Sequence, residues 1–250
     1  MYLYAFTLYA GNDRVFKYDS IATKLTFSSG DLIKIQEQYF LVLGETLSFQ
    51  EQYTSVPLIS GVVQIIHKNL LSDRTMQLIH RMSYQRYSPY KAVIKYFLPK
   101  EIATLLKKSP KKLTKTKKSE KTSTQSDFSP HQLTILAQEY ILSDQGQTLI
   151  VFPDLWTLYN TIPEEFLAKE HVAVLHSSST QNQKDKTWRG LKTGTLHVLL
   201  TTHAQIFQDF HNLKTIIQIA PHKRYYANQQ DPRYKTGMVL EQMKKIWGIT

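Results

Sequence analysis

Apolar residues in the first part of the chain alternate with polar ones, as they do in strands that bury one face. Glycines fall between these runs or at their edges, where the chain must turn. The pattern predicts a small β-rich unit. Its expected strands are the alternating positions Tyr2, Tyr4, Phe6 and Leu8, and the runs at residues 32–35, 39–43 and 62–66.

A helical period follows directly after these strands. Ser72 is suited to cap a helix N-terminus, and Met76, Ile79 and Met82 would then share one helix face. We expect this helix to end near Pro89, because proline cannot continue it. A second short segment is expected over residues 90–98.

Beyond about residue 129 the pattern changes to short apolar runs separated by helical stretches. A helix is expected over residues 129–142. Strands are expected at residues 148–152, 172–175, 196–200 and 215–219. Short apolar strands that alternate with helices are typical of a parallel sheet with crossover helices. The fold class is therefore α+β, with a β-rich domain followed by an α/β domain.

A lysine-rich tract separates the two patterns. Residues 107–121 hold eight lysines and one glutamate, and so carry most of the net charge of +11. The tract has no apolar periodicity and cannot bury enough surface to offset the entropy of ordering it. We therefore expect a flexible linker at 100–127 between domains at 1–99 and 128–250. The tract either binds phosphates of DNA or only keeps the chain soluble. The candidate phosphate-binding residues are Lys107, Lys108, Lys111, Lys112, Lys115, Lys117 and Lys118.

Composition excludes several kinds of protein. The chain has no cysteine, which excludes disulfides, iron–sulfur clusters and thiolate zinc sites. Its nine histidines are scattered along the chain and do not form a ligand cluster with carboxylates, so we expect no metal and no other cofactor. The N-terminus lacks the basic start of a signal peptide, and no apolar run approaches the roughly 20 residues that span a bilayer. We expect a cytoplasmic protein that does not bind membranes.

One segment combines cations with aromatic rings, as nucleic-acid-binding surfaces do. Alternatively, its tyrosines pack the helix onto the sheet. The candidate DNA contacts in this segment are Arg81, Tyr84, Arg86, Tyr87 and Lys91.

Several short motifs in the second half occur in a characteristic order. They are Val-Ala-Val-Leu-His-Ser at 172–177, Trp188-Arg189 followed by Gly194, Asn212-Leu213, Ile216-Ile217, His222, Tyr226 and Pro-Arg-Tyr at 232–234. In this order they resemble the first RecA-like lobe of the PriA-type superfamily 2 helicases, the family of primosomal protein N′. The resemblance implies a RecA-like fold of the P-loop NTPase type for residues 128–250.

The first half is similar to the 3′-DNA-binding domain of the same family. The similarity lies in residues 15–18, 30–35 and 84–89, and in Phe-Leu-Pro at 97–99. It implies that Phe16 and Tyr18 help to form a pocket for the 3′ end of a nascent strand. Lys17 replaces an acid of the family, which favours phosphate attraction over recognition of the terminal nucleotide. The alternative is that Phe16 belongs to the core and Lys17 is merely solvated.

The lobe departs from its family where ATP chemistry needs specific residues. No glycine lies between Gly61 and Gly146, so a glycine-rich phosphate loop cannot precede the helix expected at 129–142. Residues 219–222 read Ile-Ala-Pro-His where the family has its magnesium-binding carboxylates. Residues 201–205 lack the family's arginine. We therefore expect a degenerate lobe that is not an enzyme.

The leading hypothesis is a non-catalytic DNA-binding protein related to the primosomal restart helicase. It would bind single-stranded, 3′-ended or forked DNA in replication restart. The alternative is a structural or regulatory subunit that docks a replication or primosome protein through the helicase-like lobe. Charge alone does not distinguish DNA from RNA.

Overall fold

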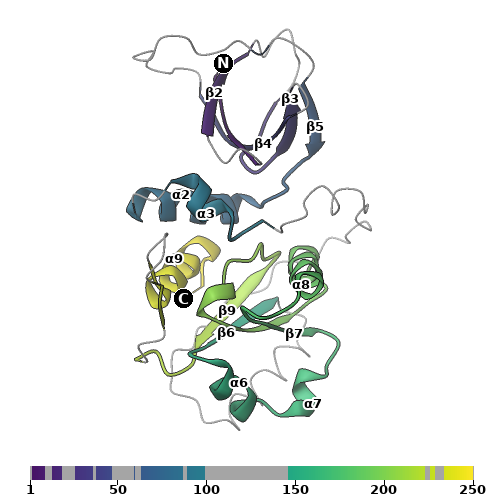
Figure 1. Ribbon diagram of the computed structural model, residues 1–250, viewed down its shortest axis with the longest axis vertical. Coiled ribbons are helices and arrows are strands. Elements are labelled where there is room, and N and C mark those ends of the chain that lie inside the picture. Colours follow the sequence, from purple (N-terminus) through teal and green to yellow (C-terminus); the bar gives the residue numbers. More distant parts are fainter. Residues whose placement is uncertain are drawn as a thin grey trace. The chain divides into compact units, whose positions relative to one another are not determined.

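The computed structural model describes residues 2–8, 13–18, 26–35, 38–46, 59, 63–86, 89–98, 146–222, 226–228 and 234–249 (Figure 1). The chain divides into two compact units. Unit 1 comprises Met1–Arg81 and Pro89–Lys91, and unit 2 comprises Met82–Ser88 and Ala92–Thr250. The predicted linker and the helix expected at 129–142 lie outside the described residues, so the predicted domain boundaries stay a prediction.

Unit 1 is built on a five-stranded antiparallel sheet with the strand order β2-β1-β4-β3-β5. The strands are β1 (Tyr2–Thr7), β2 (Asp13–Lys17), β3 (Leu32–Ile35), β4 (Gln38–Thr46) and β5 (Val63–His67). All four predicted strands are confirmed. Along β1, however, Leu3 and Ala5 are fully buried, whereas Tyr2 and Tyr4 are half-buried. The register shifts between Tyr4 and Ala5.

Strand β2 was not predicted. The stretch is too short for alternation to stand out in the sequence. Among the described strands β2 pairs with β1, with Leu3 opposite Phe16 and Tyr2 opposite Lys17, and the Ile59 N–H donates to the Lys17 carbonyl oxygen at 2.9 Å. Residues directly opposite each other point to the same face of a sheet. Phe16 therefore joins Leu3 on the core face, and Lys17 joins Tyr2 on the other face.

The predicted helix is confirmed as α2 (Asp73–Arg86). The Ser72 hydroxyl accepts a hydrogen bond from the backbone N–H of Thr75 at 3.3 Å, as expected of a capping residue. The predicted apolar face, formed by Met76, Ile79 and Met82, is buried. The short segment that follows contains α3 (Tyr90–Ile94) and a turn that ends at Leu98.

Unit 2 contains a four-stranded parallel sheet with the order β7-β8-β6-β9, which confirms the predicted α/β pattern. Its strands are β6 (Gln147–Phe152), β7 (Val172–Leu175), β8 (Val198–Thr202) and β9 (Leu213–Gln218). The helices are α6 (Leu155–Thr161), α7 (Glu164–Leu167), α8 (Gln181–Thr193), α9 (Thr236–Trp247) and the 3-10 turn η1 (His203–Gln205). A two-residue ladder joins β10 (Ala227–Asn228) to β11 (Tyr234–Lys235).

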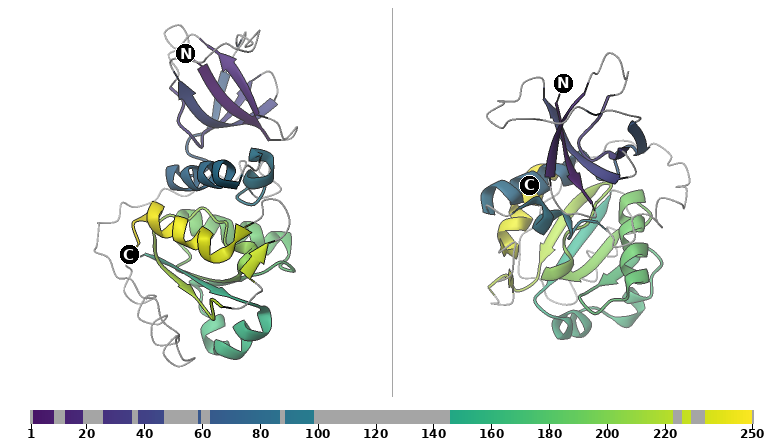
Figure 2. Two further views of the ribbon diagram at one scale, coloured as in Figure 1. Left: turned by 90° about the vertical axis from the view of Figure 1, so that its left-hand side faces the viewer. Right: turned by 45° about the horizontal axis from the view of Figure 1, so that its top comes forward.

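Helices cover both faces of the parallel sheet. Figures 1 and 2 show α6 and α7 on one face and α8 and α9 on the other. On the α6 side, Ile150, Val198 and Ile217 of the strands pack with Leu158 and Phe166 of the helices. Because the strands are parallel, their carboxyl ends meet at one edge, where ligands bind in folds of this type. None of the described helices combines the length and apolar character that crossing a membrane requires.

Candidate nucleic-acid interface

Phe16, Lys17 and Tyr18 do not present their side chains together. The Phe16 ring is 7% exposed and lies edge-on to Phe40, with ring centroids 5.2 Å apart. Tyr18 is 3% exposed and donates its hydroxyl hydrogen bond to Glu45 Oε1 at 2.7 Å. Burial raises the pKa of Tyr18, and the hydrogen bond and charge of Glu45 add to this. These positions favour the core role that the sequence left open for Phe16. Direct contact of either ring with a 3′ end stays a prediction.

Lys17 lies instead on the exposed side of β2, beside aromatic rings. Its Nζ is 5.8 Å from the centroid of the Tyr2 ring. Tyr4 follows two residues along β1, on the same face as Tyr2. The Tyr4 ring makes an edge-to-face contact with Tyr90, at a centroid distance of 5.9 Å. Lys91, next to Tyr90 in α3, is exposed.

These contacts bring the strand that carries Tyr2 and Tyr4, beside Lys17, up to Tyr90, whose neighbour in the chain is the candidate Lys91. We name the basic–aromatic surface as Tyr2, Tyr4, Lys17, Tyr90 and Lys91. Sequence reasoning did not select its three tyrosines. Tyr2 and Tyr4 are two residues apart and were taken only as signs of a strand, while the contact between Tyr4 and Tyr90 depends on tertiary structure.

A half-buried histidine contacts Tyr90. The Tyr90 hydroxyl is 2.7 Å from His80 Nδ1, and the two rings meet edge-on. Burial lowers the pKa of His80, although a hydrogen bond with the Leu43 backbone partly opposes this. The lowered pKa favours the neutral imidazole, which has one ring nitrogen that donates a hydrogen bond and one that accepts. The surface thus includes a tyrosine whose hydroxyl is hydrogen-bonded to His80.

Helix α2 carries a second set of candidates. Arg81 and Tyr84 lie one turn apart, both are exposed, and Tyr84 is 83% exposed. Arg74 and Gln77 are also exposed and continue the same stripe by helical spacing. The remaining predicted contacts lie outside the described side chains and stay predictions. They are Arg86, Tyr87 and the seven lysines between Lys107 and Lys118.

At the carboxyl edge of the parallel sheet, β9 leads into residues 219–222, which contain no carboxylate. The backbone N–H of Ile219 donates to the carbonyl oxygen of Val151 at 2.9 Å, and the hydroxyl of Tyr226 reaches the same oxygen at 2.9 Å. Burial raises the pKa of Tyr226, and the charge of Asp154 adds to the effect. Asp154 itself caps α6, because its Oδ1 accepts from the Thr157 N–H at 2.7 Å.

The residues expected to replace the phosphate loop, at 127–131, lie outside the described part of the chain. In the part that is described, no three histidine, aspartate or glutamate side chains gather as metal ligands would. At the ends of β6 and β9 the described carboxyl edge therefore presents backbone carbonyls and a buried tyrosine, with Asp154 engaged in helix capping.

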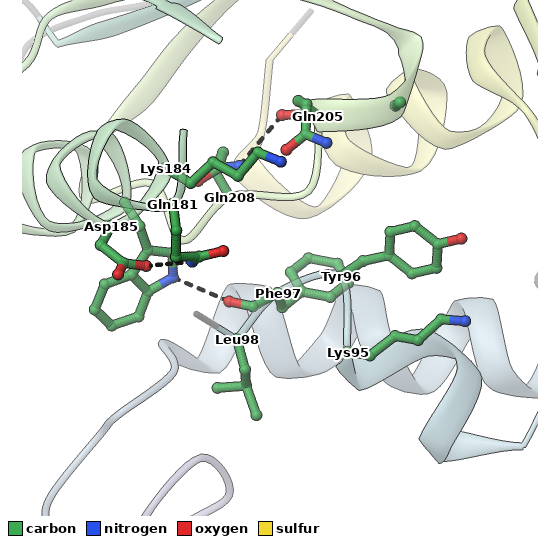
Figure 3. A pocket seen from close by; sticks show the side chains of 11 residues that line it. Lys95, Tyr96, Phe97, Leu98, Gln181, Lys184, Asp185, Gln205 and Gln208 are labelled. Carbon is green, nitrogen blue, oxygen red and sulfur yellow. Dashed lines mark hydrogen bonds between the residues drawn. The ribbon is translucent and has the colours of Figure 1, made fainter. Parts of the chain in front are cut away.

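Unit 2 also contains a pocket of about 170 Å³, which sequence reasoning missed (Figure 3). Three segments form it, namely residues 95–98, helix α8 and the loop that follows β8. The buried indole of Trp188 donates from Nε1 to the Phe97 carbonyl oxygen at 3.0 Å. The Phe207 ring lies 5.3 Å from Phe97 and 5.1 Å from Tyr234. Trp188 and Phe97, both part of the sequence motifs, thus hold residues 95–98 against the rest of unit 2.

No known protein-family profile matches the chain. The chain is similar to the replication restart protein PriA of Haemophilus influenzae, with 30% identity over 98 residues. The aligned stretch covers 38% of this chain and 13% of the length of that protein, so the chain corresponds to a small part of it. The comparison supports the broad form of the sequence expectation, which is a distant and partial similarity to replication restart protein PriA.

Proposed function

We propose that the chain is a non-catalytic DNA-binding protein of replication restart that holds single-stranded, 3′-ended or forked DNA through unit 1. The observation that carries the proposal is the basic–aromatic surface, in which Lys17 lies beside the Tyr2 ring, the Tyr4 and Tyr90 rings are in contact, and the exposed Lys91 follows Tyr90 in the chain. Lysines attract phosphates, and aromatic rings next to them give unpaired bases an apolar contact. The distant similarity to PriA favours DNA as the polyanion that this surface binds.

The expected salt dependence of binding shows that this surface needs further cations to bind DNA tightly. On single strands each neutralised phosphate adds roughly 0.7 to the slope of log affinity against log salt. Two lysines alone therefore give a slope near 1.4 and only weak binding. The exposed Arg81 and the lysines of the 107–121 tract supply the further charge. The tract would raise affinity without regard to sequence, while the folded surface sets the position of the DNA.

A titration of forked DNA tests this proposal. The full chain is titrated with forks that have a free or a blocked 3′ end, and binding is followed by fluorescence anisotropy at several salt concentrations. Replacing both lysines (Lys17→Gln with Lys91→Gln) should lower the salt slope by about 1.4. The matched control is Lys169→Gln, which removes an exposed lysine of unit 2 and should leave the slope unchanged. Equal and negligible affinity for both forks at moderate salt would refute the proposal.

The non-catalytic part of the proposal rests on two features of the sequence. Residues 219–222 contain no carboxylate, and no glycine lies between Gly61 and Gly146. Hydrolysis in a RecA-like lobe needs a backbone cradle for phosphates and a carboxylate for magnesium. Calorimetric titration of Mg-ATP into the full chain should show no binding. A saturable isotherm would contradict this part and leave the DNA-binding part standing.

Two exposed aromatic side chains on α6 support a second candidate function. Trp156 is 77% exposed and Tyr159 is 51% exposed, one helical turn apart. Exposed aromatic pairs of this kind are typical of protein interfaces. The acids Glu164 and Glu165 follow closely in the chain and disfavour DNA there. The chain would then dock a replication protein through unit 2. A partner that co-purifies after nuclease treatment, and is lost in Trp156→Ala, would support docking.

A further inference from the structure

We propose that the pocket of unit 2 binds one unpaired nucleobase and prefers guanine. All the residues that line it belong to unit 2, and none belongs to the basic–aromatic surface. The inference therefore adds a base-reading site to the proposed phosphate-binding surface, and either one can fail without the other.

The size of the pocket limits its ligand. Its volume of about 170 Å³ is below the ~300–1,000 Å³ typical of sites for drug-sized molecules. A nucleoside triphosphate is too large to be enclosed there, whereas a single planar base is of suitable size. The aromatic residues Tyr96 and Trp188 are among those that line the pocket, and rings of this kind pack against base faces.

One side chain in the pocket lacks a hydrogen-bond partner that a ligand could supply. Gln208 is 6% exposed, and its Nε2 donates to the Gln205 carbonyl oxygen at 3.3 Å. Its Oε1 is buried and has no partner among the described residues. Buried acceptors are rarely left without a donor, because losing water without gaining a hydrogen bond costs free energy. An N–H group of a bound base would satisfy this oxygen.

A carboxylate and two ammonium groups complete the lining (Figure 3). Asp185 is 7% exposed, and its Oδ1 accepts from Gln181 Nε2 at 2.8 Å. Lys184 donates to the Ser177 carbonyl oxygen at 3.1 Å, and Lys95 lies in the segment before Tyr96. A buried carboxylate needs N–H donors around it, and lysines need acceptors.

Guanine fits this set of groups better than the other bases. Its N1–H and N2 amino group offer two adjacent donors, which suit a carboxylate and an amide oxygen. Its O6 and N7 are acceptors that suit lysine. Thymine has no amino group, and adenine offers a single amino donor on its pairing edge. The base must be unpaired, since in a duplex its pairing edge is occupied and its faces are stacked.

Mononucleotide binding to the full chain tests the assignment. The probes are dGMP, dAMP, dCMP and dTMP, titrated singly and followed by ligand-observed NMR. We expect dGMP to bind at least about tenfold more tightly than dTMP, the discrimination of one good bidentate contact. Asp185→Asn should remove that tenfold preference. The matched control Glu165→Gln removes an exposed acid of unit 2 and should change neither affinity.

Gln208→Leu separates a binding role from a structural one. Leucine removes both the unsatisfied Oε1 and the 3.3 Å hydrogen bond from Nε2 to Gln205, two effects of opposite sign, so the melting temperature should change little while dGMP binds severalfold more weakly. Equal affinity for all four nucleotides, or no dGMP binding at millimolar concentration, would overturn the inference. Fork binding by the same preparation shows whether the unit 1 proposal survives that failure, because Asp185→Asn leaves the basic–aromatic surface intact.

Discussion

Phe16 and Lys17 are neighbours in β2 but face opposite sides of the sheet, so their substitution separates a core role from a binding role. Phe16→Leu removes a buried ring and its edge contact with Phe40 at 5.2 Å. The lost ring burial and aromatic pairing predict a loss of about 1–2 kcal/mol in the free energy of unfolding. Lys17→Gln removes an exposed ammonium 5.8 Å from the Tyr2 ring. A change within about 0.5 kcal/mol is expected for such an exposed site.

Two measurements on each variant give the comparison. Urea unfolding reports stability, and anisotropy of a labelled single-stranded oligonucleotide across a salt series reports binding. Phe16→Leu should lower the urea midpoint and leave the salt slope unchanged. Lys17→Gln should leave the midpoint unchanged and lower the slope by about 0.7. Phe40→Leu is the matched core control, because Phe40 is 2% exposed and contacts Phe16. The reasoning is refuted if Phe16→Leu keeps full stability and loses binding to a 3′ end.

Three further predictions concern stability. Burial raises the pKa of three tyrosines, Tyr18, Tyr226 and Tyr234. Unfolding should become easier above about pH 10, because these tyrosines ionise in the unfolded chain but stay neutral in the folded one. Each contributes up to about 1.4 kcal/mol per pH unit, and an unchanged urea midpoint at pH 11 would contradict this. Trp188→Phe leaves the Phe97 carbonyl without its donor and should cost about 1–3 kcal/mol; a loss below about 0.5 kcal/mol in urea unfolding would contradict it. Gly30→Ala places a Cβ 2.2 Å from the Leu71 oxygen at a φ of 89° and should lower the melting temperature markedly, which calorimetry checks.

Periodicity in the sequence was sufficient to predict most of the described fold. Four strands of unit 1, the buried face of α2 and the parallel strands of unit 2 all follow from runs that are local in the chain. The errors are also local. Strand β8 begins two residues later than the run at 196–200, and β9 begins at Leu213, ahead of the run at 215–219. Flanking polar residues can complete a strand because the backbone, not the side chain, forms the ladder.

The candidate sites were harder to predict because they depend on tertiary contacts. An aromatic motif identifies the types of ring but not the side of the sheet they face, so the sequence left open whether Phe16 belongs to the core or contacts DNA. The contact of Tyr4 with Tyr90 joins a strand to a helix that periodicity treats separately. The pocket of unit 2 likewise gathers three distant segments. Such sites become visible only when the strand register and the packing of helices are known.

Photo-cross-linking tests the central claim most directly. A single-stranded oligonucleotide with photoreactive bases is irradiated with the full chain, and the cross-linked peptides are identified by mass spectrometry. We predict cross-links at Tyr2, Tyr4 and Tyr90 that disappear when Lys17 and Lys91 are replaced by glutamine. Cross-links confined to the 107–121 tract, or absent from unit 1, would contradict the claim that the basic–aromatic surface binds DNA.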